Sequence, residues 1–200
     1  MTTPIPGLVL AAGASRRMGR PKALLPLGES GPPFARRICD TLTAAGVAPI
    51  VVITRSDLRD QLARVLPDVV LVVNSSPDKG QLSSLLAGLD ALASLEAALV
   101  TLVDLPLIQT TTVTSLLTAW HETHAPLVRP VHQGRHGHPV IFGAPLLDAL
   151  RSADLELGAK PVVHRFLGDA VSVPVNDRGT LDDIDTPESF DRLTPRGRHG

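Results

Sequence analysis

Apolar residues recur along the chain in short, nearly continuous runs of the length of a β-strand. Continuous runs, unlike alternating ones, are typical of strands that are buried on both faces, as in a parallel sheet. The runs fall at residues 8–11, 50–53, 69–73 and 98–103. Segments with the length and composition of helices follow them or lie between them, at residues 34–45, 57–65, 81–95 and 111–123. This alternation predicts an α/β protein with a Rossmann-like, doubly wound and mostly parallel sheet.

Local signals mark some of the element boundaries. Gly46 follows the first predicted helix as a C-cap, and Ser56 precedes the second as an N-cap. Beyond residue 125 the rhythm changes. Strands are expected at 127–131, 139–142 and 170–175, helices near 144–150 and 158–166, and an acidic turn, NDRGTLDDIDTPESF, after the last strand. We expect one domain over residues 1–193 and a disordered polar tail at 194–200.

Composition restricts the class of protein. The chain has 200 residues, 44% of them hydrophobic, which is enough for a sizeable core, and a formal net charge of −1 argues against nucleic acid as a partner. The single cysteine, Cys39, allows no disulfide within the chain and is expected to be a buried structural thiol. No signal peptide precedes the first apolar run, and no uncharged run approaches the ~18 residues of a membrane span. We therefore expect a cytoplasmic protein with no membrane partner.

The segment AAGASRRMGRPK leaves the first predicted strand at its carboxyl end, which is where ligands bind in open α/β sheets. Gly13 allows backbone N–H groups to approach an anion, Ser15 adds a hydroxyl donor, and Arg16, Arg17 and Lys22 add positive charge. The spacing excludes both G-x-x-x-x-G-K-[ST] and G-x-G-x-x-G. The composition favours a polyphosphate ligand, and a basic surface loop is the alternative.

Polar residues elsewhere in the pattern allow more than one interpretation. Asp104 ends a buried run, where a carboxylate is costly unless it binds a metal such as magnesium or caps a turn. Ser83 and Ser84 open a predicted helix and either cap it or bind a base edge or ribose. The loop HQGRHGH offers three histidines for zinc, for an acceptor phosphate, or as surface residues: His132, His136 and His138. The acidic turn holds four aspartates, most of them expected at the surface: Asp177, Asp182, Asp183 and Asp185.

Several ordered segments resemble those of one nucleotidyltransferase family. LAAGASRRMGRPKALLPLG is similar to the family pattern L-A-[AG]-G-x-S-x-R-M-G-x-x-K, and GQLSSLLAGL, LVDLPLI, GRHGHPVIF and GTLDDIDTPESF resemble further family segments in the same order. More narrowly, the chain resembles the molybdenum cofactor cytidylyltransferases. The resemblance implies a three-layer sandwich like that of the nucleotide-diphospho-sugar transferases. It also implies transfer of CMP from CTP to a phosphorylated acceptor, molybdenum-loaded molybdopterin, with release of pyrophosphate and with Mg²⁺ as cofactor.

The resemblance also assigns roles to individual residues. It implies that Lys22, Arg17 and Asp104 are catalytic, and that Asp104 and Asp185 bind the metal, with Asp183 as the alternative to Asp185. The implied nucleotide-binding residues are Leu10, Ala11, Ala12, Gly13, Ser15, Arg16, Lys22, Gly80 and Ser84. Those implied for the acceptor are His136, His138 and Pro139. Ala12 stands where guanosine-using relatives carry glycine, which implies CTP.

Leu157 and Lys160 depart from a G-D-x-G-A-R pattern of the family, in a segment that the resemblance places near the acceptor. Two rival interpretations remain. One is a sibling nucleotidyltransferase that acts on a sugar, polyol or other small phosphate. The other is a nucleotide-binding accessory protein that delivers cofactor without turnover. A molybdenum enzyme that receives the cofactor is implied as a further partner.

Overall fold

The strands of the protein form one mixed sheet at its centre. A computed structural model describes residues 3–92 and 95–193. The strand order is β3-β2-β1-β4-β7-β5-β6, and β8 pairs with β5. The strands are β1 (Gly7–Leu10), β2 (Ile50–Thr54), β3 (Val70–Val73), β4 (Ala97–Leu102), β5 (Leu127–His132), β6 (Arg135–His136), β7 (Val140–Gly143) and β8 (Ala170–Pro174). Strands β1 to β4 are parallel to one another and β8 is parallel to β5, whereas β7 runs antiparallel to both β4 and β5.

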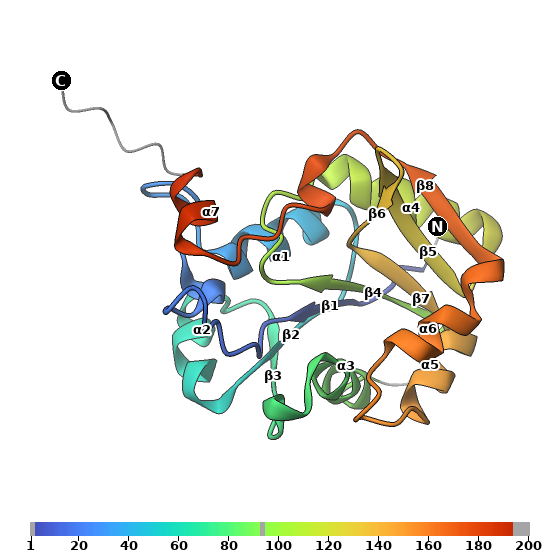
Figure 1. Cartoon of the computed structure of the whole chain (residues 1–200), viewed down its shortest axis with the longest axis horizontal. Coiled ribbons are helices and arrows are strands. Elements are labelled where there is room, and N and C mark those ends of the chain that lie inside the picture. Colours follow the sequence, from blue (N-terminus) through green and yellow to red (C-terminus); the bar gives the residue numbers. More distant parts are fainter. Residues whose placement is uncertain (1–2, 93–94, 194–200) are drawn as a thin grey trace.

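Helices cover both faces of this sheet (Figure 1). The helices are α1 (Phe34–Ala44), α2 (Arg59–Val65), α3 (Gln81–Asp90), α4 (Thr110–Thr123), α5 (Ala144–Arg151), α6 (Lys160–Arg165) and α7 (Pro187–Asp191). One core cluster packs α1, α2 and α4 against one face, and a second packs α3, α5 and α6 against the other. The predicted doubly wound, mostly parallel α/β sheet is confirmed. Within the described ranges no helix has the length and apolar character to cross a membrane.

The continuous apolar runs of the sequence become the central strands, with small shifts at their ends. Along β1 and β2, Leu8 and Val51 belong to one core cluster and Val9 and Val52 to the other, because successive side chains point to opposite faces. A strand buried on both faces needs apolar residues at every position, which is why the runs are continuous. The predicted strand at 69–73 begins one residue later, at Val70.

Some predicted helix boundaries are right and others are wrong. After α1, Gly46 has a φ of 92°, its N–H donates to the carbonyl oxygen of Thr43 at 3.0 Å, and Val47 donates to Leu42 at 3.1 Å, which is a Schellman ending. The predicted N-cap Ser56 is wrong: it begins a short 3₁₀ turn, η2 (Ser56–Leu58), and α2 starts only at Arg59.

The helix predicted at 81–95 ends at Asp90, so the prediction was too long. The helix predicted near 158–166 is shorter as well and spans only Lys160–Arg165, after which a 3₁₀ turn, η4 (Leu167–Asp169), leads into β8. The tail predicted at 194–200 lies outside the described residues.

Cys39 lies in α1 and is fully buried. Burial raises the pKa of its thiol to about 12. A thiol that stays protonated at neutral pH is a poor nucleophile, so the side chain acts as a small apolar group of the core.

Candidate active site

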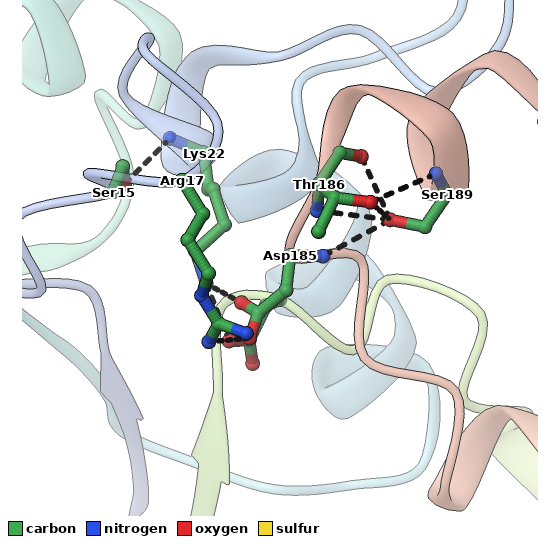
Figure 2. Close-up of polar contacts among 7 residues, drawn as sticks. Ser15, Arg17, Lys22, Asp185, Thr186 and Ser189 are labelled. Carbon is green, nitrogen blue, oxygen red and sulfur yellow. Dashed lines mark hydrogen bonds and ion pairs between the residues drawn. The ribbon is translucent and has the colours of Figure 1, made fainter.

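An ammonium group lies between two carboxylates at the carboxyl end of β4. The Nζ atom of Lys22 donates to Oδ2 of Asp104 at 2.6 Å and also to Oδ1 of Asp185. The guanidinium of Arg17 donates to Oδ2 of Asp185 (Figure 2). Lys22 begins a 3₁₀ turn, η1 (Lys22–Leu24), in the loop after β1, and Asp104 follows β4 by two residues. Three segments far apart in the sequence therefore meet in one charged cluster.

The charges of this cluster support one another. Burial alone would lower the pKa of Lys22, but hydrogen bonds to Asp104 and Asp185 outweigh it and raise that pKa. Burial would raise the pKa of Asp185, and here too the bond from Lys22 and the nearby charge of Arg17 outweigh burial and lower it. At neutral pH Lys22 is therefore an ammonium ion and Asp185 a carboxylate. The side chain of Lys22 is only 12% exposed, so water screens its ion pairs weakly.

Backbone contacts hold the acidic turn beside β4. The N–H of Ile184 donates to the carbonyl oxygen of Asp104 at 2.8 Å, which fixes Asp185 next to Asp104. Thr186 caps α7 in a capping box with Ser189, and Oγ of Ser189 accepts the N–H of Asp185 at 3.2 Å (Figure 2). The position of the second carboxylate is therefore set by a helix start as well as by the strand beside it.

Asp177 anchors the same turn from its other end. It is 2% exposed, and its Oδ2 accepts hydrogen bonds from the N–H of Gln109 at 2.9 Å and the hydroxyl of Thr112 at 2.7 Å. Its Oδ1 accepts the N–H of Gly179 at 2.9 Å. A Cβ on Gly179 would lie 2.4 Å from the carbonyl oxygen of Leu107, so only glycine allows this approach. The sequence suggested surface positions for most of the four aspartates of this turn, but Asp177 is buried and the side chain of Asp185 is only 15% exposed.

Asp182 and Asp183 occupy the outer side of the turn. Asp183 is exposed, and Asp182 forms a surface ion pair with Arg178. Asp185, and not Asp183, carries the carboxylate that faces Lys22. This geometry favours Asp185 of the two predicted alternatives for a metal ligand.

Most residues predicted to contact a nucleotide line one cavity of about 180 Å³ beside Lys22, which we call the loop cavity. Its lining includes Leu10, Ala12, Gly13, Ser15, Lys22, Gly80, Ser84 and Asp104. Ser15 bends the loop with a φ of 50°, and its Oγ accepts the N–H of Lys22 at 3.2 Å. The lining combines loop backbone, a hydroxyl and an ammonium group, which suits a phosphate.

Two of the predicted contacts lie outside the lining. Ala11 is buried in the core under α1, and Arg16 is exposed on the outer side of the loop. Ala11 directly follows β1. Because successive side chains point to opposite faces of the sheet, Ala11 points away from the face on which Leu10 lines the cavity.

Ser83 and Ser84 do not cap α3, because Gly80 is its N-cap and no side chain caps it. Instead Nδ2 of Asn74 donates to the hydroxyl oxygens of Ser83 at 2.9 Å and Ser84 at 3.0 Å. Ser83 donates onward to the carbonyl oxygen of Gly80 at 2.7 Å. Sequence reasoning missed Asn74, although a polar residue at the carboxyl end of an apolar strand is the same kind of signal as Asp104.

A second cavity of about 370 Å³ adjoins the first, and both are lined by Leu10, Gln81 and Leu102. We call it the apolar cavity, because most of its walls are aliphatic or aromatic. His136 and His138, which we predicted to contact the acceptor, both line it, whereas Pro139, predicted with them, is buried outside the lining. Burial lowers the pKa of His138, so its imidazole is neutral at pH 7.

The third histidine of the loop lies apart from the other two. Nδ1 of His132 is 3.1 Å from the carbonyl oxygen of Val175, which ties β5 to the end of β8. Among residues 3–92 and 95–193 no three histidine, cysteine or acidic side chains gather as a metal site. The zinc alternative therefore finds no support in the arrangement of these histidines.

Asp104 and Asp185 suit a divalent cation that is completed by ligand oxygens. Oδ1 of Asp104 is buried and has no hydrogen-bond partner. An unsatisfied buried carboxylate oxygen needs a proton donor or a cation. Magnesium is typically held by one or two carboxylates together with substrate phosphates and water. Asp104 lines the loop cavity and shares the ammonium of Lys22 with Asp185, so this pair of carboxylates fits the ion.

Comparison with known proteins places the chain among nucleotidyltransferases. Residues 7–171 match the family model of the MobA-like NTP transferase domain. The chain is 32% identical to a nicotine blue oxidoreductase of Paenarthrobacter nicotinovorans, over 94% of this chain and 96% of that protein. It is 27% identical to the molybdenum cofactor cytidylyltransferase of Escherichia coli K12, over 96% and 95% of the two chains. It is 30% identical to a molybdenum cofactor guanylyltransferase of Rhodobacter capsulatus, over 97% of each.

A solved structure shares the fold. The crystal structure of Rv0371c from Mycobacterium tuberculosis H37Rv superposes with a TM-score of 0.81 at 22% identity, over 98% of this chain and 100% of that one. The similarity spans the sheet and both helical layers.

Proposed function

The chain belongs to the family of MobA-like NTP transferase domains and is a nucleotidyltransferase, and from this premise we propose that it transfers CMP from CTP to a phosphorylated acceptor, with release of pyrophosphate. We further propose that the acceptor is molybdenum-loaded molybdopterin, that Mg²⁺ is the cofactor, and that the reaction takes place in the cytoplasm. The observation that carries the proposal is the ammonium of Lys22 between Asp104 and Asp185, with Lys22 and Asp104 in the lining of the loop cavity.

The reaction asks little covalent chemistry of the protein. The attacking group is a phosphate monoester, whose second pKa is about 6, so it is largely dianionic at pH 7 and needs no general base. The loop cavity holds the triphosphate so that the acceptor phosphate, entering from the apolar cavity, attacks the α-phosphorus in line. Holding the two reactants in this geometry supplies much of the rate enhancement.

Lys22 and Arg17 neutralise the pyrophosphate that leaves. Both cations come from the loop after β1, and their charge offsets the charge that develops on the leaving oxygen. Asp104 and Asp185 would hold Mg²⁺, which would neutralise phosphate charge and orient the triphosphate. The Lys22 ammonium lies between these carboxylates, so a metal held by both would require it to turn toward the phosphates.

Ala12 supports CTP as the nucleotide. It is 4% exposed and lines the loop cavity, where its methyl group takes space that a larger purine base would need. Overall identity does not choose the base, since the chain is 27% identical to a cytidylyltransferase and 30% identical to a guanylyltransferase. The choice therefore rests on this one side chain.

Pyrophosphate release tests the proposal. Purified protein is incubated with CTP or GTP, Mg²⁺ and molybdenum-loaded molybdopterin, and pyrophosphate is measured with and without the acceptor. The proposal expects release that needs all three components and is faster with CTP. Release with a sugar or polyol phosphate and none with the pterin would identify a sibling enzyme.

Nucleotide binding without pyrophosphate release in the presence of any of these acceptors would identify an accessory protein. Because the 32% identical relative is named an oxidoreductase, a parallel assay for nicotine blue reduction belongs in the same experiment. Reduction without pyrophosphate release would overturn the proposal.

A further inference from the structure

Arg129 carries a buried donor with no partner at the wall of the apolar cavity. Its Nε atom is buried and forms no hydrogen bond, and among the described residues its side chain forms no ion pair. A buried donor without a partner costs free energy, on the order of 1–3 kcal/mol. Such a group in a native protein calls for an explanation, and a ligand that binds there would supply one.

The strand pattern places Arg129 on the cavity side of the sheet. Residues of β5 alternate between the two faces, so Arg129 shares a face with Leu127. Leu127 packs in the core cluster beneath α3, α5 and α6 and lines the apolar cavity, as Arg129 does. An arginine at this position replaces the apolar residue that the pattern would otherwise require.

The titratable side chains of the cavity wall are all basic. Besides Arg129 they are His136, His138, Lys160 and His164, and among the described lining residues there is no aspartate or glutamate. Lys160 and His164 lie one turn apart on the same face of α6. Arg129 and Lys160 are cations, and no carboxylate of the wall offsets them, so the cavity attracts an anion.

This anion is distinct from the nucleotide's phosphates. Those have Lys22 in the loop cavity, whereas Arg129 does not line that cavity. Strand β7 separates β4 from β5, so the backbone of Arg129 lies two strands, or ~10 Å, from the strand that leads to Asp104. The rest of the wall, with Val140, Phe142 and Leu167 among its residues, suits an apolar or aromatic body.

We propose that Arg129 binds an anionic group of the acceptor inside the apolar cavity and thereby selects acceptors whose aromatic or apolar body carries a negative charge. The inference rests on the proposed function, because it takes this cavity as the acceptor's site. Arg129 is then a specificity-determining residue. Its planar guanidinium offers paired donors to a carboxylate, phosphate or similar oxyanion.

Binding of two small probes tests the proposal without turnover. Benzoate and its neutral analogue benzyl alcohol are titrated into the full chain by calorimetry. The parent should bind benzoate at least about 10-fold more tightly, as expected for a hydrogen bond to a charged group. Arg129→Met should lose this preference, and so should Arg129→Gln, which keeps a polar side chain. Arg135→Met is the control, because Arg135 is exposed on β6 outside the lining and should keep the full preference.

Equal binding of the two probes by the parent would overturn the proposal, as would a preference that survives in both Arg129 variants. Displacement of benzoate by CTP would also overturn it, since the anion would then lie in the loop cavity. Thermal unfolding of Arg129→Met should occur at or above the temperature of the parent, because the substitution removes an unpaired buried donor.

Failure of the proposed function would be visible separately. If the protein binds benzoate through Arg129 yet releases no pyrophosphate with any acceptor, the proposed anion site is supported and the proposed transferase function is wrong. In an active enzyme, Arg129→Met should raise the KM for the acceptor about 10-fold or more and leave the KM for CTP unchanged.

Discussion

The backbone N–H of Ile184 donates a 2.8 Å hydrogen bond to the carbonyl oxygen of Asp104. This contact joins the segment after β4 to the acidic turn after β8, and it holds the carboxylates of Asp104 and Asp185 on either side of Lys22. A main-chain bond of this kind survives substitution of the side chains around it. We therefore expect single substitutions of the charged side chains to leave the backbone contact between these two segments in place.

Asp104→Ala should abolish most turnover while the fold stays intact. The carboxylate is expected to bind the metal, and loss of one such electrostatic contact typically costs about 10²-fold or more in rate. Pyrophosphate release is measured across a magnesium titration, with circular dichroism as the check on folding. The matched control is Asp183→Ala, an exposed residue of the acidic turn, which should retain activity. If Asp183→Ala loses activity and Asp104→Ala retains it, the assignment of Asp104 as a metal ligand is wrong.

Lys22→Ala should weaken binding of the triphosphate and also slow the chemical step. The ammonium group is expected to contact the phosphates both before and during departure of pyrophosphate. Lys22→Arg should rescue only in part, because a planar fork cannot occupy the position of a compact ammonium. Nucleotide affinity and single-turnover rates give the two effects separately.

The same variant has a second readout in the absence of nucleotide. Since Nζ of Lys22 lies between Asp104 and Asp185, its removal should let Mn²⁺ bind these carboxylates more tightly than in the parent, as measured by calorimetry. If nucleotide affinity, single-turnover rate and Mn²⁺ affinity all equal those of the parent, Lys22 does not contact the phosphates and the loop is only a basic surface loop.

Ala12→Gly should shift the nucleotide preference toward GTP. The methyl group lines the loop cavity, and one methyl in a pocket is worth about 1–3 kcal/mol, or roughly 10- to 200-fold in discrimination. Competition kinetics with CTP and GTP give the ratio directly for the parent and the variant. A parent that uses GTP as well as CTP would contradict the proposed role of Ala12.

Asp177→Ala should lower the free energy of unfolding by about 3 kcal/mol or more, because it leaves the buried donors of Gln109, Thr112 and Gly179 without an acceptor. Urea unfolding measures the loss. Asp182→Ala is the control, since it removes only a surface ion pair and should cost under about 1 kcal/mol. Turnover should also fall in Asp177→Ala, because the turn that carries Asp185 loses its anchor. Equal stability of the two variants would show that Asp177 is not an anchor.

Cys39 should resist alkylation in the folded protein. Because burial raises its pKa to about 12, the thiolate fraction at pH 8 is lower than that of a free cysteine by a factor on the order of 10³. Iodoacetamide labelling followed by mass spectrometry should therefore show modification only after unfolding in urea. Rapid labelling of the native protein at pH 8 would contradict the structural role.

The hydrophobic pattern predicted the parallel strands of the sheet, because strands buried on both faces are continuously apolar. It did not predict the short strand β6, which is polar and lies in the segment expected to be a loop. Ser83 and Ser84 show where local reasoning fails. Serine near a helix start reads as a cap, but here Asn74 of a neighbouring strand end takes both hydroxyls, a partner that only the folded sheet supplies. Competition between local and tertiary hydrogen bonds decides such cases.

Asp177 and Asp185 show a second limit of prediction from local sequence. Both stand in one acidic turn and look alike in sequence, yet one is a buried anchor and the other faces Lys22. Each accepts a hydrogen bond from a segment remote in the chain, 68 residues away for the bond between Asp177 and Gln109 and 163 for that between Asp185 and Lys22. The resemblance to a family indicated Asp185. Nothing in the local pattern indicated Asp177.

Helix α7 contributes to a small apolar cluster whose members include neighbours of the charged residues. Buried side chains from the loop after β1, from α1 and from the segment around α7 meet there: Met18, Leu25, Phe34, Ile184 and Phe190. Figure 1 shows α7 lying beside the loop after β1. During synthesis the sheet has all its strands once Pro174 is made, yet neither this cluster nor the second carboxylate exists until the following segment has been added. A nascent chain therefore contains every strand of the sheet before it contains the residues that complete the charged site.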